Sequence, residues 1–158
     1  TNRFIHKELG CNYRMTNMQA ALGVAQMERI NEIVEKKRYI GNTYNKLLKD
    51  IKEVNLPVVR TDYCENIYWV YAITLNDDYH KTVEEVMFKL GEYKIGTRPF
   101  FYPMHKQPVF NKMKLFLNDR LPSSEKLYKK GFYIPSGLAL AEDQIKEVSV
   151  ALHKIFAS

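Results

Sequence analysis

The sequence contains few cysteines and no long apolar run, and both absences limit what the protein can be. Two cysteines, Cys11 and Cys64, stand among 158 residues. They form no CxxC pair or metal-ligand pattern, and two are too few for a disulfide framework. No apolar stretch approaches the ~20 residues that a membrane-spanning helix needs. The N-terminus lacks the basic-then-apolar pattern of a signal peptide. We therefore expect a cytoplasmic protein with no membrane partner.

Several catalytic motifs are also missing. The sequence contains no GxGxxG, GxxxxGK[ST] or GxSxG motif, which removes the simplest arguments for a dinucleotide site, a P-loop or a nucleophilic serine. The four histidines do not stand at metal-ligand spacing with one another or with cysteine or carboxylate residues, so we expect no metal site. We find no internal repeat or low-complexity tract either.

The charge is basic but spread along the chain. The net charge is +6, from 24 lysine and arginine residues against 18 acidic residues, and the 46% hydrophobic fraction is that of a soluble globular protein. A basic, tyrosine-rich chain could bind RNA or DNA, but no RNP-like, helix-turn-helix or zinc-finger pattern occurs. We expect no nucleic-acid partner, whereas an anionic small ligand would need only two or three of these charges.

Residues 16–50 have the pattern of one long or broken helix. Thr16 and Gln19 fit a capping box, apolar residues then recur at helical spacing, and Gly41 could mark a bend. The first half of this helix is thin because four of its residues are small: Ala20, Ala21, Gly23 and Ala25. A thin helix allows another element to approach its backbone closely, so we expect a partner surface there.

Residues 51–158 read as a small α/β domain, of the α+β type. The run IYWVYAITL, 67–75, is the clearest strand and is apolar on both faces, as in a central strand. The other predicted elements are two short strands, 94–98 and 132–134, and three helices, 82–90, 123–130 and 143–156. This order predicts a small sheet covered by helices. With 1–15 as a connecting segment, we expect 1–158 to be a single domain.

Two stretches could bind a ligand. Asn12 and Arg14 stand just before a helix N-terminus, where an arginine fork and free N–H groups suit a phosphate. The residues alone favour a simpler interpretation, in which Asn12 forms an Asx turn and Arg14 is a surface charge. His105 lies in the proline-stiffened run FFYPMHKQP, 100–108, which is either a positioned histidine site or a loop packed on the core.

Several motifs together resemble one family, the DegT/DnrJ/EryC1/StrS sugar aminotransferases. They are GCNYRMTNMQAALGVAQMERINE, the strand YWVYAI, the loop KIGTRPFFYPMHKQP, and the closing run LPSSEKLYKKGFYIPSGLALAEDQI. They span 3–156 in the family's order and spacing. Within the family, the loop is most similar to that of the GDP-perosamine synthases, which aminate a GDP-linked 4-keto-6-deoxy sugar.

The resemblance implies the small C-terminal domain of a fold type I pyridoxal-phosphate enzyme, normally a homodimer. The Schiff-base lysine of the family would precede Thr1. We therefore expect the C-terminal part of a longer aminotransferase, with no catalytic residue of its own and no activity alone. The whole enzyme would move an amino group, most often from glutamate, to a nucleotide-linked keto sugar for O-antigen or other glycan biosynthesis.

Residue roles also follow from the resemblance. Asn12 maps to an asparagine that binds the cofactor phosphate in the partner's active site, and Arg14 would lie beside it. His105 maps to a histidine near the nucleotide-sugar substrate, with Arg98, Phe101 and Tyr102 lining the same cleft. Two positions depart from the family: Cys11 stands in place of an aromatic residue and Ala141 in place of a threonine helix cap.

Three alternatives stay open at this stage. One is a related pyridoxal-phosphate sugar dehydratase of the same fold, in which a histidine outside this chain replaces the lysine. The second is a non-catalytic interaction domain that uses the same fold. The third is a nucleic-acid binder, which rests only on charge and aromatic content.

Overall fold

The computed structural model describes residues 14–157, and the chain divides into two units, 1–33 and 34–158. In the first unit, α1 (Asn17–Glu28) begins with the predicted capping box. Thr16 Oγ1 accepts a hydrogen bond from Gln19 N at 3.2 Å, and Thr16 N donates to Gln19 Oε1 at 2.9 Å. None of the residues of α1 is buried.

The predicted helix over 16–50 is broken at Arg29. There α1 ends, with Arg29 at φ −111° and ψ 11°, and α2 (Ile30–Leu48) begins. The bend predicted at Gly41 is wrong. This glycine lies inside α2, where a Cβ atom would overlap the ring of Tyr68, so it makes room for packing.

The sheet of the second unit is small and wholly antiparallel. Its order is β1-β2-β4-β3, formed by Val54–Asn55, Tyr71–Leu75, Gly131–Ile134 and Arg98–Pro99. The predicted central position of the 67–75 strand is confirmed, because β2 pairs with β1 on one side and β4 on the other.

The strand begins later than the sequence predicts. Tyr68 has a φ of 50°, the left-handed region that bulky residues seldom adopt, and its N–H donates to Asn66 Oδ1 at 2.7 Å. This local turn keeps Tyr68 and Trp69 out of β2. Similarly, Lys94 and Ile95 do not form a strand, because their N–H groups donate back to carbonyls at the end of α3 (Val83–Glu92).

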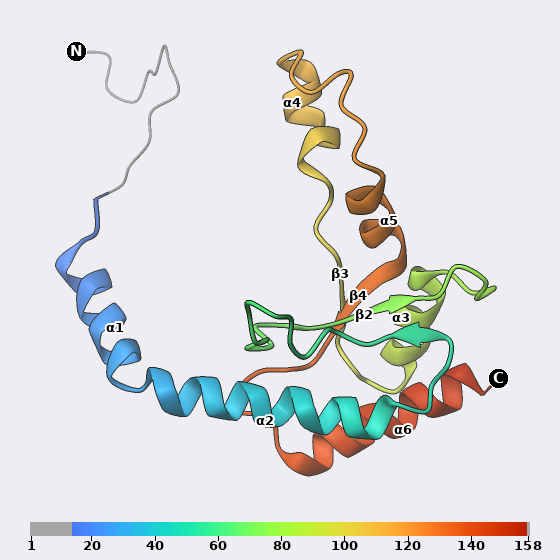
Figure 1. Cartoon of the computed structure of the whole chain (residues 1–158), viewed down its shortest axis with the longest axis horizontal. Helices are drawn as coiled ribbons and strands as arrows, with labels where there is room; N and C mark the ends of the chain where they lie inside the picture. The colour runs from blue at the N-terminus through green and yellow to red at the C-terminus, as the bar shows by residue number, and fades with distance from the viewer. Residues whose placement is uncertain (1–13, 158) are drawn as a thin grey trace. The chain divides into compact units, whose positions relative to one another are not determined.

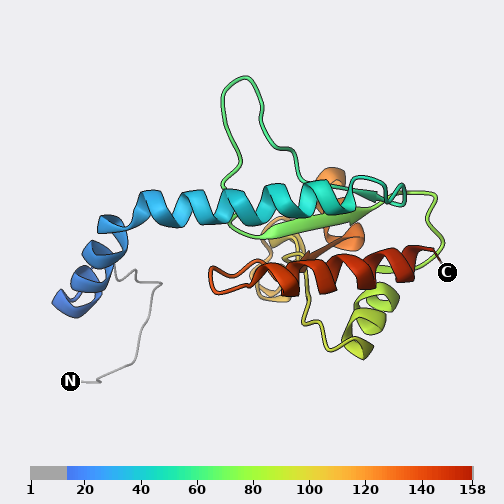
Figure 2. The same ribbon diagram turned by 90° about the horizontal axis from the view of Figure 1, so that it is seen from below.

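The core lies where helices cover the sheet. The helices that bury side chains there are α2, α3 and α6 (Glu142–Phe156). No residue of the short α4 (Pro108–Lys112) or of α5 (Pro122–Lys130) is buried, and the 3₁₀ helix η1 (Met104–Lys106) lies between β3 and α4. In the second unit, α2 and α6 run side by side in Figures 1 and 2, and His153 Nε2 lies 2.9 Å from the Leu47 carbonyl. Alternate residues of β2 are buried, and Tyr71 packs on Tyr44 of α2 with ring centroids 4.8 Å apart.

The segment between β3 and β4 leaves the sheet and returns to it. It contains η1, α4 and α5, and Figure 1 shows α4 and α5 extending away from the strands. Leu115 N donates to Phe110 O at 2.9 Å, and the rings of Phe110 and Phe116 meet edge to face at 5.6 Å. Because α5 runs back toward the sheet, it lies beside residues some twenty positions earlier in the chain.

Candidate functional site

His105 is buried and lies next to a carboxylate partner. The η1 turn, which follows Pro103, holds the histidine with only 5% of its surface exposed. Its Nε2 lies 3.1 Å from Glu125 Oε1 of α5. A buried imidazole with a carboxylate partner has a fixed ring orientation, as a positioned binding group requires.

Glu125 is the residue that sequence reasoning missed. Its second oxygen, Oε2, accepts a hydrogen bond from Lys106 Nζ at 2.7 Å, so one carboxylate serves two neighbours of η1. The hydrogen bonds from Lys106 and then His105 lower the pKa of Glu125 to about 2. The carboxylate is therefore ionised at neutral pH, and the His105 nitrogen that faces it carries the proton.

The aromatic residues of the 98–108 loop contact partners outside it. Phe101 lies nearly parallel to Trp69, with centroids 6.5 Å apart, and meets Tyr133 edge to face at 6.1 Å. Tyr102 meets Tyr128 of α5 edge to face at 5.0 Å. Phe101 and Trp69 are largely exposed, so they form an aromatic surface next to the sheet.

The structure places the four predicted substrate residues on one continuous segment. Arg98 is exposed in β3, opposite Tyr133, and Phe101, Tyr102 and His105 follow it. Within the described part of the chain, no hydrogen bond, ion pair or ring contact joins these four residues to one another. These four residues stay predicted substrate-binding residues.

The predicted phosphate residues are only partly covered by the structure. Asn12 lies outside the described residues. Arg14 is described and exposed, two positions before the N-cap of α1. The capping prediction is confirmed there, whereas the phosphate prediction stays a prediction.

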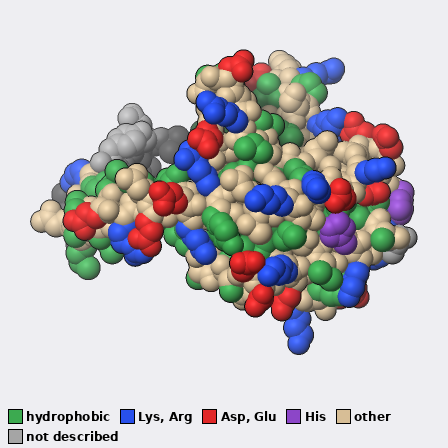
Figure 3. All heavy atoms as spheres, turned by 60° about the horizontal axis from the view of Figure 1, so that its bottom comes forward, with side chains coloured by type: hydrophobic (Ala, Val, Ile, Leu, Met, Phe, Trp, Pro, Cys, Tyr) green, Lys and Arg blue, Asp and Glu red, His purple; other side chains and the backbone are tan. Residues whose placement is uncertain are grey.

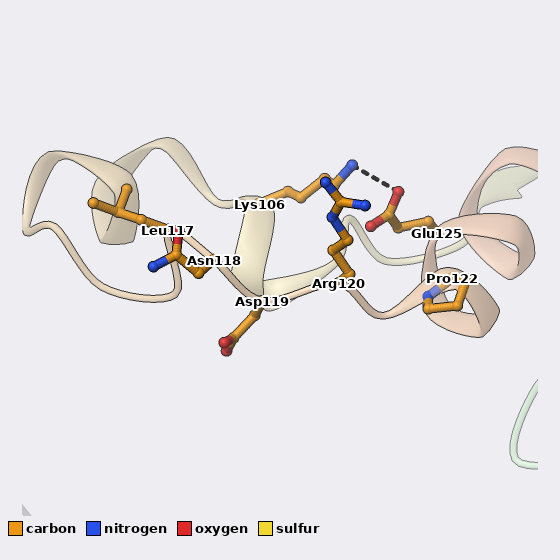
Figure 4. A pocket seen from close by; sticks show the side chains of 7 residues that line it. All are labelled: Lys106, Leu117, Asn118, Asp119, Arg120, Pro122 and Glu125. Atoms are coloured by element: carbon orange, nitrogen blue, oxygen red, sulfur yellow. Dashed lines mark hydrogen bonds and ion pairs between the residues drawn. The ribbon is translucent and has the colours of Figure 1, made fainter.

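A cavity of about 750 Å³ lies next to the His105–Glu125 pair. Seven residues line it: Lys106, Leu117, Asn118, Asp119, Arg120, Pro122 and Glu125. Figure 4 shows that the Arg120 side chain extends toward Lys106 and Glu125, whereas Asp119 points to the other side. The volume of this cavity falls in the range of ordinary small-molecule sites.

Residues 14–157 contain neither a metal-binding cluster nor a membrane-spanning helix. No group of three or more histidine, cysteine, aspartate or glutamate side chains is placed to hold a metal ion. None of the described helices is both long and apolar enough to cross a membrane. On the face drawn in Figure 3, basic and acidic side chains are interspersed.

Comparison with known proteins places this geometry in a family. The GDP-perosamine synthase of Vibrio cholerae is 32% identical over 157 residues, covering 98% of this chain and 41% of that protein. The solved structure of Helicobacter pylori PseC, an aminotransferase involved in the biosynthesis of pseudoaminic acid, has a TM-score of 0.79. It is 20% identical, covering 96% of this chain and 40% of that one.

A second structure, DesV from S. venezuelae, gives a TM-score of 0.80 at 19% identity, over 99% of this chain and 40% of that one. These likenesses confirm the predicted fold, a small sheet covered by helices as in fold type I sugar aminotransferases. The chain spans about two fifths of the length of these relatives. The model of the DegT/DnrJ/EryC1/StrS aminotransferase family matches residues 1–153, and the chain belongs to that family.

Proposed function

We propose that this chain is the C-terminal part of a pyridoxal-phosphate aminotransferase that aminates a nucleotide-linked keto-deoxy sugar. The observation that carries the proposal is the family match over residues 1–153. The similarity to GDP-perosamine synthase over 98% of the chain favours GDP-4-keto-6-deoxymannose as the sugar, with glutamate as the amino donor. The product would be GDP-perosamine, used in O-antigen or other glycan biosynthesis in the cytoplasm.

The substrate side of the proposal rests on the loop that holds His105. Nε2 of His105 is bonded to Glu125, so Nδ1 is the ring nitrogen left for a hydrogen bond with a sugar hydroxyl. The exposed aromatic surface of Phe101 and Trp69 suits the flat face of a base or sugar ring. Arg98 and Tyr102 complete the set proposed to line the substrate cleft.

Of the two residues predicted to bind the cofactor, only Arg14 lies within the described residues. When bound, pyridoxal phosphate supplies the electron sink for amino transfer. Arg14 has the charge that a phosphate needs, and it stands just before a helix N-terminus, so the residue fits the group in charge and position. We propose that Asn12 and Arg14 hold the phosphate in the partner's active site of a homodimer. The described residues do not form a whole cofactor site.

The proposal predicts that this chain alone does not catalyse amination, whereas a longer enzyme containing it does. Both proteins would be incubated with pyridoxal phosphate, glutamate and GDP-4-keto-6-deoxymannose, and the products separated by chromatography. Amination by the longer enzyme only is the expected result. A lysine aldimine absorbance band in this chain alone would contradict the prediction that the chain is inactive. A deoxygenated sugar from the longer enzyme would show that the longer enzyme is a dehydratase.

A further inference from the structure

The cavity between η1 and α5 has a surplus of positive charge at one corner. Lys106 and Arg120 both line it, and Glu125 is the carboxylate at that corner. Glu125 already bonds Lys106 at 2.7 Å and His105 at 3.1 Å. Asp119 lines the cavity too, but Figure 4 shows its side chain directed away from this group.

Arg120 forms no ion pair with a carboxylate in the part of the chain that the structure describes, although the residue directly before it is an aspartate. Figure 4 shows the Arg120 side chain directed to the same side of the cavity as Lys106 and Glu125. Lys106 is paired with Glu125 and the Arg120 guanidinium is not, so an anion in the cavity would be stabilised by the charge of Arg120.

We infer that Lys106 and Arg120 bind the diphosphate of a nucleotide sugar in this cavity, an assignment that rests on the proposed function. An arginine fork matches two phosphate oxygens, and a lysine supplies a compact charge that tolerates several phosphate positions. The cavity of about 750 Å³ has room for a diphosphate together with part of the groups attached to it.

The position of His105 supports this ligand over a lone phosphate. In a nucleotide sugar, the diphosphate is joined directly to the sugar, so the groups that bind the two parts should be neighbours. Here Glu125 contacts both: Oε1 faces His105, the proposed sugar residue, and Oε2 faces Lys106 at the diphosphate corner. One carboxylate therefore aligns the two halves of the proposed site.

The test measures binding of inorganic pyrophosphate, GDP and inorganic phosphate to this chain by calorimetry at low salt. We expect pyrophosphate and GDP to bind more tightly than phosphate. Arg120→Ala should weaken the affinity for pyrophosphate and for GDP by about 10-fold to 100-fold, because the substitution removes charge-assisted hydrogen bonds. Arg120→Lys should be intermediate, since it keeps the charge and loses the fork.

Lys112→Ala is the matched control, because Lys112 lies in α4, carries the same charge and does not line the cavity. Its affinity for pyrophosphate should stay within about 2-fold of the parent chain. Circular dichroism melting checks that every variant folds. Absence of pyrophosphate binding to the folded parent, or equal losses in the Arg120 and Lys112 variants, would overturn the inference.

A kinetic arm in the longer enzyme separates this inference from the proposed function. Arg120→Ala should raise KM for the nucleotide sugar and leave KM for glutamate unchanged. Amination with an unchanged nucleotide-sugar KM would refute the diphosphate site and leave the function standing. Arg120-dependent pyrophosphate binding in a protein that aminates no sugar nucleotide would support the anion site and refute the function.

Discussion

Helices α1 and α6 begin in similar ways but differ in what covers them. In both, a glutamine at the third helical position accepts a hydrogen bond from the capping residue's N–H, and at α1 Thr16 Oγ1 adds the reciprocal bond. The N-cap of α6 is Ala141, which has no side chain to contribute. Yet α6 buries seven residues, and α1 buries none. Capping thus marks where a helix begins, whereas packing decides how firmly it is held.

The largest expected difference is between leucines of the two helices. Leu152 of α6 is 0% exposed and Leu22 of α1 is 68% exposed. Leu152→Ala should lower the free energy of unfolding by about 2–5 kcal/mol because it leaves a cavity in the core. Leu22→Ala should change it by less than about 0.5 kcal/mol. Urea denaturation followed by circular dichroism measures both, and equal losses would contradict the comparison.

Gly41 tests the packing of α2 against the strained residue before β2. Gly41→Ala should lower the free energy of unfolding by about 1–3 kcal/mol, since the new methyl overlaps the Tyr68 ring. Gly23→Ala in α1 is the control, because nothing lies within 4 Å of a Cβ there. That control should stabilise α1 slightly through helix propensity. A neutral Gly41→Ala variant would show that Tyr68 moves freely.

The caps themselves should have smaller effects. Ala141→Thr should stabilise the protein by about 1 kcal/mol, because threonine supplies the missing acceptor at the α6 N-terminus. Thr16→Ala removes the same acceptor from α1, where no residue is buried. It should leave the main melting transition unchanged and reduce only helical circular dichroism. Loss of the main transition in Thr16→Ala would show that the packing argument is wrong.

Two carboxylates sharpen the comparison further. Glu32, in the first turn of α2, forms an exposed ion pair with Arg29, and this pairing lowers the pKa of Glu32. Glu125 has a side chain 25% exposed and a pKa lowered to about 2. A depressed pKa gives stability that is present above the ordinary value near 4.5 and is lost as pH falls toward the folded value.

Glu125→Gln should therefore flatten the acid dependence of the melting temperature between about pH 5 and 2. Glu32→Gln should show a smaller effect that disappears in high salt, since exposed pairs are screened. Melting scans across this range in low and high salt make the measurement. An unaltered acid profile in Glu125→Gln would contradict the pairing with Lys106 and His105.

Local signals predicted much of this fold. The capping box at Thr16, the central strand and the α5 and α6 helices follow from residue types a few positions apart. The break at Arg29 carries no glycine or proline to mark it. The left-handed turn at Tyr68 depends on its ring reaching Gly41 and Asn45 of α2, a contact invisible in sequence.

Only part of the candidate site could be predicted from the sequence: His105 was predicted and Glu125 was not. The loop pattern singled out His105, and the family resemblance gave it a role, but neither indicated its partner. Glu125 reaches His105 because α5 returns beside η1 after a twenty-residue excursion, so no short-range spacing encodes the pair. The sequence does not predict the cavity beside Arg120 for the same reason.

The most direct test of the proposed amination traces the amino nitrogen of glutamate into the nucleotide sugar. The longer enzyme that contains this chain would be incubated with pyridoxal phosphate, GDP-4-keto-6-deoxymannose and glutamate labelled with ¹⁵N at the amino group. Mass spectrometry of the nucleotide sugar would then locate the label. We predict a GDP-linked amino sugar with one ¹⁵N atom and an equal amount of 2-oxoglutarate. A nucleotide sugar that acquires no label while the enzyme is folded and loaded with cofactor would contradict the account.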